Sequence, residues 1–361
     1  MEVRVRAFNI PTERPEQDGT LEWDSTTLVT VELTEEGVTG LGYTYADKAT
    51  ALSIVERAFP ILTKGKARDH HLLTTEIKKK SRNCGNAGVT SMALSAVDTA
   101  LWDLRAHLLG IPVQELLGRK RESVPFYGSG LFINGSDEDV SHQISYFKSF
   151  GMKSFKMKIG SGVDEDLRRV NFVRNLIGEE AELFVDANGA YDTKTALMIA
   201  HEISEYQVSW FEEPVTSDDP NGMKFLREHF PPGMNFVAGE YGNQNHDFLS
   251  LLQNGLVDII QADATRAEGV TGTLEASHLA SAFNIPFSTH CAPLLHGNIG
   301  VAVSGLYIAE GFYDHLRIEE KFFNHSGTYK DGNFFPSPDQ RGFGWSLKEN
   351  IEGYSAYEHV A

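Results

Sequence analysis

Residues 154–188 read SFKMKIGSGVDEDLRRVNFVRNLIGEEAELFVDAN, which is a strand, a helix and a second strand in succession. The runs at both ends have strand composition, and the segment 164–177 between them has helical periodicity. Lys156 and Lys158 lie in the first strand, and Asp186 closes the second. Strands joined through a helix run in the same direction, so this unit predicts a parallel sheet.

The same unit repeats along the chain. Counted onward from Lys156, the successive strand ends follow at intervals of 30, 26, 28, 23 and 27 residues and carry Asp186, Glu212, Glu240, Asp263 and His290. One strand, one helix and two loops of ordinary length fill such an interval. The expected strands are 124–127, 154–159, 182–185, 208–211, 235–239, 257–261, 285–288 and 309–313. About eight such units close into a barrel, whose strand ends converge on one mouth.

The first 120 residues have a different pattern. Their expected strands are 3–8, 27–33 and 40–45, and their expected helices are 48–63, 69–80 and 86–109. Antiparallel strands followed by separate helices predict an α+β unit. The tail, 325–361, is rich in turn residues, and we expect it to pack back on this first unit. The predicted domains are therefore 1–120, completed by 325–361, and a barrel over 121–324.

Composition narrows the possible partners. The chain has 361 residues, 41% of them hydrophobic, which suffices for a large core, and its net charge is −18. That charge argues against nucleic acid and against anionic membranes. Cys84 and Cys291 show no metal-ligand spacing, and their number favours a reducing compartment. The start of the chain lacks an apolar signal core, and no apolar run is long enough to span a bilayer. We expect a soluble cytoplasmic protein.

Three acidic strand ends predict a metal site. Asp186, Glu212 and Glu240 close three consecutive units, and carboxylates about 4 Å apart repel by about 4 kcal/mol per pair at an effective dielectric of about 20. Any one of them alone could be a solvated strand-end acid or a helix cap, but three in succession favour a shared divalent cation. All-oxygen ligation favours one Mg²⁺ ion, with Mn²⁺ as the alternative. Asn188 shares a side with Asp186 and is expected to bond a ligand or a neighbouring lysine, whereas Glu213 is expected to point away toward a lysine or arginine.

Proton carriers are expected on both sides of this cluster. Lys156 and Lys158 share one face of their strand, and like-charge repulsion is expected to lower the pKa of each. Asp263 and His290 end adjacent units, where the carboxylate would orient the imidazole. A lone lysine pair or a lone histidine is more often structural, but the combination predicts a proton-transfer site. A carboxylate substrate held there would lose its α-proton and form an enolate.

At this point the chain resembles the enolase superfamily, specifically its mandelate racemase-like subgroup (mandelate racemase/muconate lactonizing enzymes). The family's K-x-K, D-x-N, E-E-P and G-E motifs and its Asp–His dyad correspond to Lys156-Met157-Lys158, Asp186-Ala187-Asn188, Glu212-Glu213-Pro214, Gly239-Glu240, and Asp263 with His290. Residues 96–103 resemble the long-helix signature of the capping domain. The resemblance implies an α/β fold: a modified TIM barrel, (β/α)₇β, with an α+β capping domain formed by the N-terminal region and the C-terminal tail.

The resemblance also implies roles for individual residues. Lys158 would be the usual base, and Asp186, Glu212 and Glu240 the Mg²⁺ ligands. A glutamate on the last strand that bonds the substrate carboxylate would be Glu310, with Glu319 and Glu320 as competitors. Specificity would come from mobile capping-domain loops at 11–23 and 83–86. The substrate-binding candidates are Trp23 and Asp24 from the first loop, with Asn188.

Two departures from the commonest family pattern add candidates. Tyr241 directly follows Glu240, and Arg266 lies three residues after Asp263, so Tyr241 and Arg266 are further candidate substrate-binding residues. Other positions that could set specificity are Tyr127, Ser129 and His296. For Tyr127 and His296 we expect ordinary packing instead.

The predicted function is a Mg²⁺-dependent acid-sugar dehydratase that removes the α-proton of a hydroxy-carboxylate. One group would take that proton and a histidine would protonate the departing β-hydroxyl. The alternative is a racemase or epimerase that acts by 1,1-proton transfer, or a cycloisomerase. A non-catalytic binding barrel would predict missing ligands or bases, and every expected position is filled. The expected partner is a small hydroxy acid, and the resemblance implies a homo-oligomer, either a dimer or an octamer.

Overall fold

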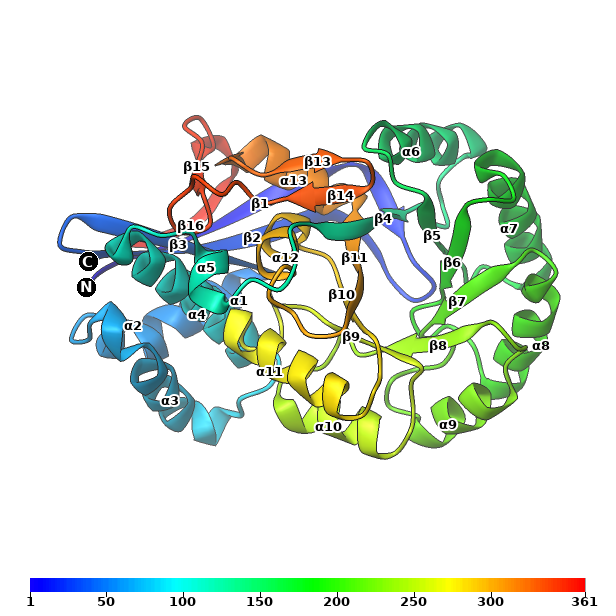
Figure 1. Cartoon of the computed structure of the whole chain (residues 1–361), viewed down its shortest axis with the longest axis horizontal. Helices are drawn as coiled ribbons and strands as arrows, with labels where there is room; N and C mark the ends of the chain where they lie inside the picture. Colours follow the sequence, from blue (N-terminus) through cyan, green and yellow to red (C-terminus); the bar gives the residue numbers. More distant parts are fainter. Residues whose placement is uncertain (361) are drawn as a thin grey trace.

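A computed structural model describes residues 1–360 and contains two units that lie side by side (Figure 1). An antiparallel sheet with its helices forms one unit, drawn mainly in blue and cyan, and a closed parallel barrel forms the other. Within residues 1–360, none of the helices combines the length and the apolar character that crossing a bilayer requires. The fold predicted from the spacing of the strand ends is confirmed.

The first unit is built on a four-stranded antiparallel sheet in the order β16-β1-β2-β3. Its strands are β1 Glu2–Gln17, β2 Glu22–Glu35, β3 Val38–Ala46 and β16 Ser355–Val360. Its helices are α1 Lys48–Ser53, a π-helical turn Ile54–Ala58, α2 Phe59–Leu62, α3 His70–Ser81 and α4 Val89–Leu109. The expected single helix 48–63 is thus divided, and the π-helical turn precedes Pro60, which has no backbone N–H to continue the α-helical bonding.

The segment 11–23, which was expected to be a mobile loop, lies in a long β-hairpin. Strand β1 continues to Gln17 and β2 begins at Glu22, with one register shift in their pairing. The Asp18 carboxylate accepts hydrogen bonds from the backbone N–H groups of Thr20 and Leu21, at 2.7 Å each, and so closes the turn. The prolines in this segment and its polar composition hid the strand period. We call residues 11–25 the capping hairpin.

The tip of the capping hairpin rests on the barrel. The backbone N–H of Ile133 donates to the carbonyl of Gln17 at 2.9 Å. Gly19 lies so close to the carbonyl of Ala187 that a Cβ at this position would overlap it. The hairpin therefore reaches the carboxyl ends of the barrel strands.

The second unit is a closed barrel of eight parallel strands, because β11 also pairs with β4. The strands are β4 Val124–Gly130, β5 Ser154–Lys158, β6 Glu182–Asp186, β7 Val208–Glu212, β8 Asn235–Ala238, β9 Ile259–Ala262, β10 Phe287–Thr289 and β11 Leu306–Phe312. The helices of this part of the chain are α5 Val113–Leu117, α6 Asp137–Ser149, α7 Val163–Ile177, α8 Thr193–Ser204, α9 Pro220–His229, α10 Asn245–Gln253, α11 Gly269–Ala282, α12 Pro293–Ile299 and α13 Tyr313–Phe322.

The C-terminal tail contacts both units, although we expected all of 325–361 to pack on the first. Strand β16 pairs with β1, as expected. Strand β14 (Asn333–Phe335) instead pairs with β4 of the barrel, and β13 (Thr328–Lys330) pairs with β14. Strands β12 (Phe323–His325) and β15 (Trp345–Leu347) form a separate pair. Phe334 explains the difference, because its fully buried side chain belongs to the core beside β4.

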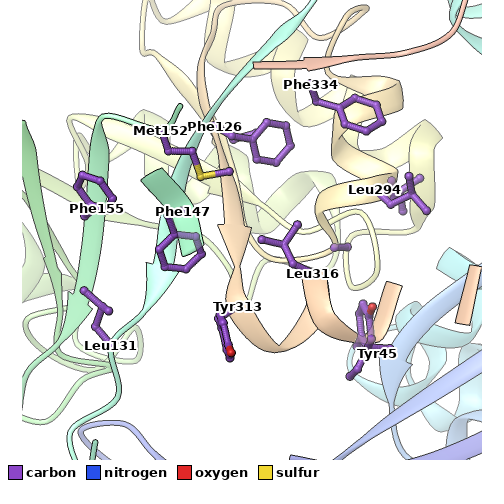
Figure 2. Close-up of a cluster of buried hydrophobic side chains, with 14 of the residues drawn as sticks. Tyr45, Phe126, Leu131, Phe147, Met152, Phe155, Leu294, Tyr313, Leu316 and Phe334 are labelled. Atoms are coloured by element: carbon purple, nitrogen blue, oxygen red, sulfur yellow. The ribbon is translucent and has the colours of Figure 1, made fainter. Parts of the chain in front are cut away.

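One hydrophobic core joins the two units. Figure 2 shows this core running from Phe155 of β5 and Phe147 of α6, past Leu316 of α13, to Tyr45 of β3. A second cluster lies between the antiparallel sheet and α3 and α4. The shared core fixes the first unit over the barrel mouth.

Strand β3 and helix α4 pack with backbone in contact, which predicts a sensitive position at Gly42. A Cβ at Gly42 would overlap the carbonyl of Ala96. We expect Gly42→Ala to lower the free energy of unfolding by about 1–3 kcal/mol, measured by urea denaturation. Gly353→Ala is the matched control, because a Cβ there meets no atom within 4 Å. Equal denaturation midpoints for the two variants would contradict the packing argument.

Candidate active site

The ends of three neighbouring strands bring three carboxylates together. Asp186 ends β6, Glu212 ends β7, and Glu240 follows β8. One oxygen from each lies within 4.8 Å of the others, and all three side chains are buried. The parallel register sets Asp186 directly opposite Glu212, which is why the spacing in sequence becomes proximity in space.

The carboxylate cluster suits a divalent cation. Glu240 Oε2 is buried and has no hydrogen-bond partner. Burial raises the pKa of Glu212 well above its ordinary value. The charge of Lys156 lowers this pKa, but the charges of Asp186 and Glu240 offset part of that lowering. Three carboxylate oxygens, one of them unsatisfied, match the ligands that Mg²⁺ prefers. Asp186, Glu212 and Glu240 are therefore the residues that could hold the ion.

Both lysines of β5 contact this cluster. Lys158 Nζ donates to Asp186 Oδ2 at 2.6 Å and to Asn188 Oδ1 at 2.9 Å, so the lysine partner expected for Asn188 is Lys158. Lys156 Nζ lies 2.8 Å from Glu212 Oε1 and 2.9 Å from Glu310 Oε1.

The pKa values of the lysines differ from our expectation. Burial lowers the pKa of Lys158, but the charges of Asp186, Glu240 and Glu212 together outweigh it, and the net shift is upward. The pKa of Lys156 is also raised, because Glu212 and Glu310 outweigh its burial. Repulsion from Lys156 does lower the pKa of Lys158, as expected, but an expected net lowering is wrong for the protein alone, because the carboxylates in contact with the lysines outweigh it.

Asp263 and His290 form a hydrogen-bonded pair beside the cluster. His290 Nδ1 donates to Asp263 Oδ2 at 2.9 Å, and the other carboxylate oxygen accepts from Thr265. Burial raises the pKa of Asp263, but the bond from His290 and the charge of Arg266 outweigh it, so the pKa is well below its ordinary value. His290 Nε2 is left facing Glu240 Oε2 at 3.4 Å. The imidazole is thereby oriented toward the carboxylate cluster.

Glu310 of β11 and its competitor Glu319 of α13 have different surroundings. Glu310 in β11 accepts the backbone N–H of Cys291 at 2.6 Å in addition to its ion pair with Lys156. Glu319 accepts from the Tyr43 hydroxyl at 2.6 Å and from the backbone N–H of Leu294 at 2.8 Å. Glu310 thus lies in the site, whereas Glu319 ties the first unit to α12.

A cavity of about 210 Å³ lies beneath the capping hairpin. Its lining includes the site residues Lys158, Glu240, Asp263 and His290. The substrate-binding candidates that line it are Trp23, Asn188, Tyr241 and Arg266. Asp24 does not line the cavity; it is exposed and accepts from Ser25. Trp23 and Asp24 are neighbours in a strand, so only one of them can face the cavity.

Other cavity residues were missed from the sequence. They are Thr26, Tyr45, Cys291, Phe312 and His315. The register between β1 and β2 that aims Thr26 inward has no signature in the sequence. Cys291 could have been found, because it follows His290 directly. Tyr127 and His296 are buried, as expected for ordinary packing.

The partner predicted for Glu213 is wrong. Its backbone has a φ of 37°, so strand alternation does not govern where its side chain points. The Ser217 hydroxyl donates to Glu213 Oε1 at 2.6 Å, and no ion pair within residues 1–360 involves this carboxylate. Burial instead raises its pKa, with a further contribution from Glu240.

Comparison with known families matches both units. Residues 1–118 match the family model described as mandelate racemase / muconate lactonizing enzyme, N-terminal domain. Residues 139–351 match the one described as enolase C-terminal domain-like. The chain belongs to the mandelate racemase/muconate lactonizing enzyme family of the enolase superfamily.

Three relatives illustrate what this family member is similar to. A mandelate racemase/muconate lactonizing enzyme-like protein from Rubrobacter xylanophilus is 40% identical, with a TM-score of 0.95 over 98% of this chain and 99% of that chain. L-talarate/galactarate dehydratase from Salmonella typhimurium is 28% identical over 89% of this chain and 80% of its own length. Its crystal structure liganded with Mg and L-lyxarohydroxamate gives a TM-score of 0.90 at 25% identity, over 100% of this chain and 93% of that chain. Arabinonate dehydratase from Saccharolobus solfataricus is 26% identical over 90% and 89% of the two chains.

The support of Trp23 predicts a pH-dependent stability. Trp23 Nε1 donates to Glu16 Oε2 at 2.9 Å, and burial together with the charge of Asp314 raises the pKa of Glu16 to about 8. Between about pH 4.3 and about pH 8, the folded state therefore keeps a proton on Glu16 that the unfolded chain has released. Glu16 thus lowers the free energy of unfolding as the pH rises from about 4.3 to about 8.

Glu16→Gln should remove this dependence, because the amide oxygen can still accept from Trp23 but does not ionise. We expect the difference in free energy of unfolding between the variant and the natural protein to grow in the variant's favour as pH rises from about 5 to about 8. Above about pH 8 this difference should stay constant. Urea denaturation at pH 5.5, 7 and 8.5 measures it. Glu22→Gln, at an exposed position in the same hairpin, is the control. Parallel pH profiles for all three proteins would contradict the assignment.

Proposed function

We propose that this protein is a Mg²⁺-dependent acid-sugar dehydratase. The observation that carries the proposal is the arrangement of Lys158 and the His290–Asp263 pair around one buried carboxylate cluster. A hydroxy-carboxylate in the cavity would meet a base and an acid together. The two dehydratases among the relatives, one of them liganded with Mg, support the same reaction.

Asp186, Glu212 and Glu240 would hold the ion. When bound, Mg²⁺ supplies the positive charge that stabilises the anion formed as the α-proton leaves. Lys158 must be neutral to accept that proton. Use of Asp186 as a metal ligand would weaken the contact that raises the pKa of Lys158 most.

Lys158 would take the α-proton from one face of the substrate. His290, oriented by Asp263, would donate a proton to the β-hydroxyl, so that the carbon–oxygen bond breaks and water leaves. The resulting enol becomes a 2-keto-3-deoxy acid on taking up a proton at the β-carbon.

Lys156 would bind the carboxylate end of the substrate, and Glu310 would hold Lys156 in place. Burial raises the pKa of Glu310, but the charges of Lys156, His290 and Lys158 together outweigh it, and the net shift is downward. An ionised Glu310 cannot donate a hydrogen bond to a substrate carboxylate. We therefore assign it to holding Lys156, which would make that contact, in place of the direct contact that the family resemblance implies.

The second candidate is a racemase or epimerase, favoured by the proton carriers on two sides of the carboxylate cluster. Incubation with an acid-sugar library and Mg²⁺ in deuterated water separates the two. We expect loss of the α-proton together with release of a 2-keto-3-deoxy acid. Exchange of the α-proton without any keto product would exclude dehydration and favour the isomerase.

Lys158→Ala tests the assignment of the base. We expect turnover to fall by about 10²–10⁴-fold, because no group replaces the amine, whereas Mg²⁺ affinity measured by isothermal titration should change little. Lys153→Ala, at an exposed position beside the same strand, is the matched control and should behave as the natural protein does. Unaltered turnover in Lys158→Ala would show that another group is the base.

We also propose that the protein is cytoplasmic and that it forms a homo-oligomer. Both cysteines are free, Cys84 exposed and Cys291 buried, which suits a reducing compartment. The small-molecule cavity and the net charge of −18 favour a small hydroxy acid over nucleic acid as the partner.

A further inference from the structure

An apolar wall forms part of the cavity outside the carboxylate cluster. Trp23, Cys291 and Phe312 line the cavity and pack with Phe132 as one cluster. The ring centroids of Phe132 lie 5.6 Å from Trp23 and 5.8 Å from Phe312, both edge to face. Because Glu16 fixes the indole, this wall is held in place. It offers hydrophobic contact to the part of a substrate that extends away from the metal ligands.

The cations of the cavity are already paired. Lys158 contacts Asp186, and Arg266 Nη1 lies 3.3 Å from Glu240 while its Nε lies 3.6 Å from Asp263. Lys158 and Arg266 are the only lysine and arginine that line the cavity within residues 1–360. Where Mg²⁺ takes Asp186 and Glu240, Lys158 is committed to the α-proton and Arg266 still lies beside Asp263, so a second carboxylate on the substrate would find no free cation here.

His315 does not supply the missing charge. Its Nδ1 accepts the backbone N–H of Ala292 at 3.2 Å, and its ring stacks on Tyr45 with centroids 3.5 Å apart. Burial lowers the pKa of His315 to about 3, so the ring is neutral at physiological pH. It can serve as a neutral hydrogen-bonding group for a hydroxyl.

The capping hairpin adds negative charge next to this wall. Asp18 lines the cavity, and Glu13 lies in the same hairpin with its carboxylate accepting from the Tyr313 hydroxyl at 2.9 Å. The hairpin's arginine, Arg14, is paired with Asp139. A second carboxylate would therefore lose its hydration against an apolar wall and beside like charges, which is costly.

We infer that the substrate is a sugar acid with a single carboxylate and an uncharged, apolar far end, such as a 6-deoxyhexonate. The inference rests on the proposed function and refines it. The single carboxylate would bind at the metal-ligand end of the cavity, on the side toward Lys156, hydroxyl groups would meet the polar side chains, and the terminal methyl group would contact Trp23 and Phe312. Trp23, Cys291 and Phe312 are thereby specificity-determining residues. Aldarates, which have a carboxylate at each end, are excluded.

The test compares three acids of the same configuration at the four inner carbons: a hexonate, its 6-deoxy analogue and its aldarate. For each configuration that is turned over, we expect the 6-deoxyhexonate to have a kcat/KM at or above that of the hexonate. The aldarate should be at least about tenfold below the hexonate. An aldarate within tenfold of the hexonate, or a 6-deoxyhexonate below it, would overturn the inference.

A charge added to the cavity tests the cause of the discrimination. Leu21 lines the cavity and is 64% exposed, so Leu21→Arg places a free cation there at little cost to folding. We expect the aldarate-to-hexonate ratio of kcat/KM to rise several-fold. Leu72→Arg adds the same charge at an exposed position of α3 that does not line the cavity, and it should leave the ratio unchanged. An equal ratio in the two variants would contradict the electrostatic argument.

Failure of the inference is distinguishable from failure of the proposed function. If aldarates exchange their α-protons and release keto acids, the reaction stands and only the substrate class is wrong. If no sugar acid of any class exchanges its α-proton in deuterated water, the proposed function fails and the inference fails with it.

Discussion

Repulsion among buried carboxylates is the constraint on which the rest of this structure depends. The ion-pair network at the barrel mouth contains five carboxylates and three obligate cations, namely Asp186, Glu212, Glu240, Asp263, Glu310, Lys156, Lys158 and Arg266. With all five carboxylates ionised, the excess is two negative charges, which one divalent cation would balance. Burying such an excess without compensation is costly, because water no longer screens it. The network is therefore built to bind a cation, and it is costly to folding when no cation is bound.

The barrel is what makes this arrangement achievable. Each carboxylate sits within two residues of the carboxyl end of a strand whose neighbours fix its register, so the side chains cannot relax apart. The first unit contributes the capping hairpin, which covers the same mouth with Trp23. The first unit also shares the barrel's core through Tyr45 of β3. The charged side of the cavity thus comes from strand ends, and much of its uncharged wall comes from the capping hairpin and the end of β11. Chemistry and specificity reside on different parts of the chain.

Much of the site could be predicted because strand ends of a parallel barrel have only one place to converge. The intervals between Asp186, Glu212, Glu240, Asp263 and His290 were sufficient to place them together. Side-chain direction in the capping hairpin was not predictable, since Pro11 and Pro15 hide the strand period, and Asp24 consequently faces away from the cavity where Trp23 faces it. The raised pKa of Lys158 was missed for a different reason. It depends on contacts of a few ångströms with Asp186 that sequence spacing cannot supply. The C-terminal tail is divided between the two units because Phe334 is buried in the core beside β4, which the sequence pattern could not reveal either.

The central claim is that Asp186, Glu212 and Glu240 share one ion. Crystals grown with Mn²⁺ in place of Mg²⁺ would test it by anomalous diffraction, because manganese can be located independently of the protein atoms. We predict a single strong anomalous peak that marks one manganese ion. This ion should be bonded to one oxygen from each of these three carboxylates, with Lys158 on one side and His290 on the other. A peak elsewhere, or three carboxylates that turn to separate partners in saturating Mn²⁺, would contradict the account.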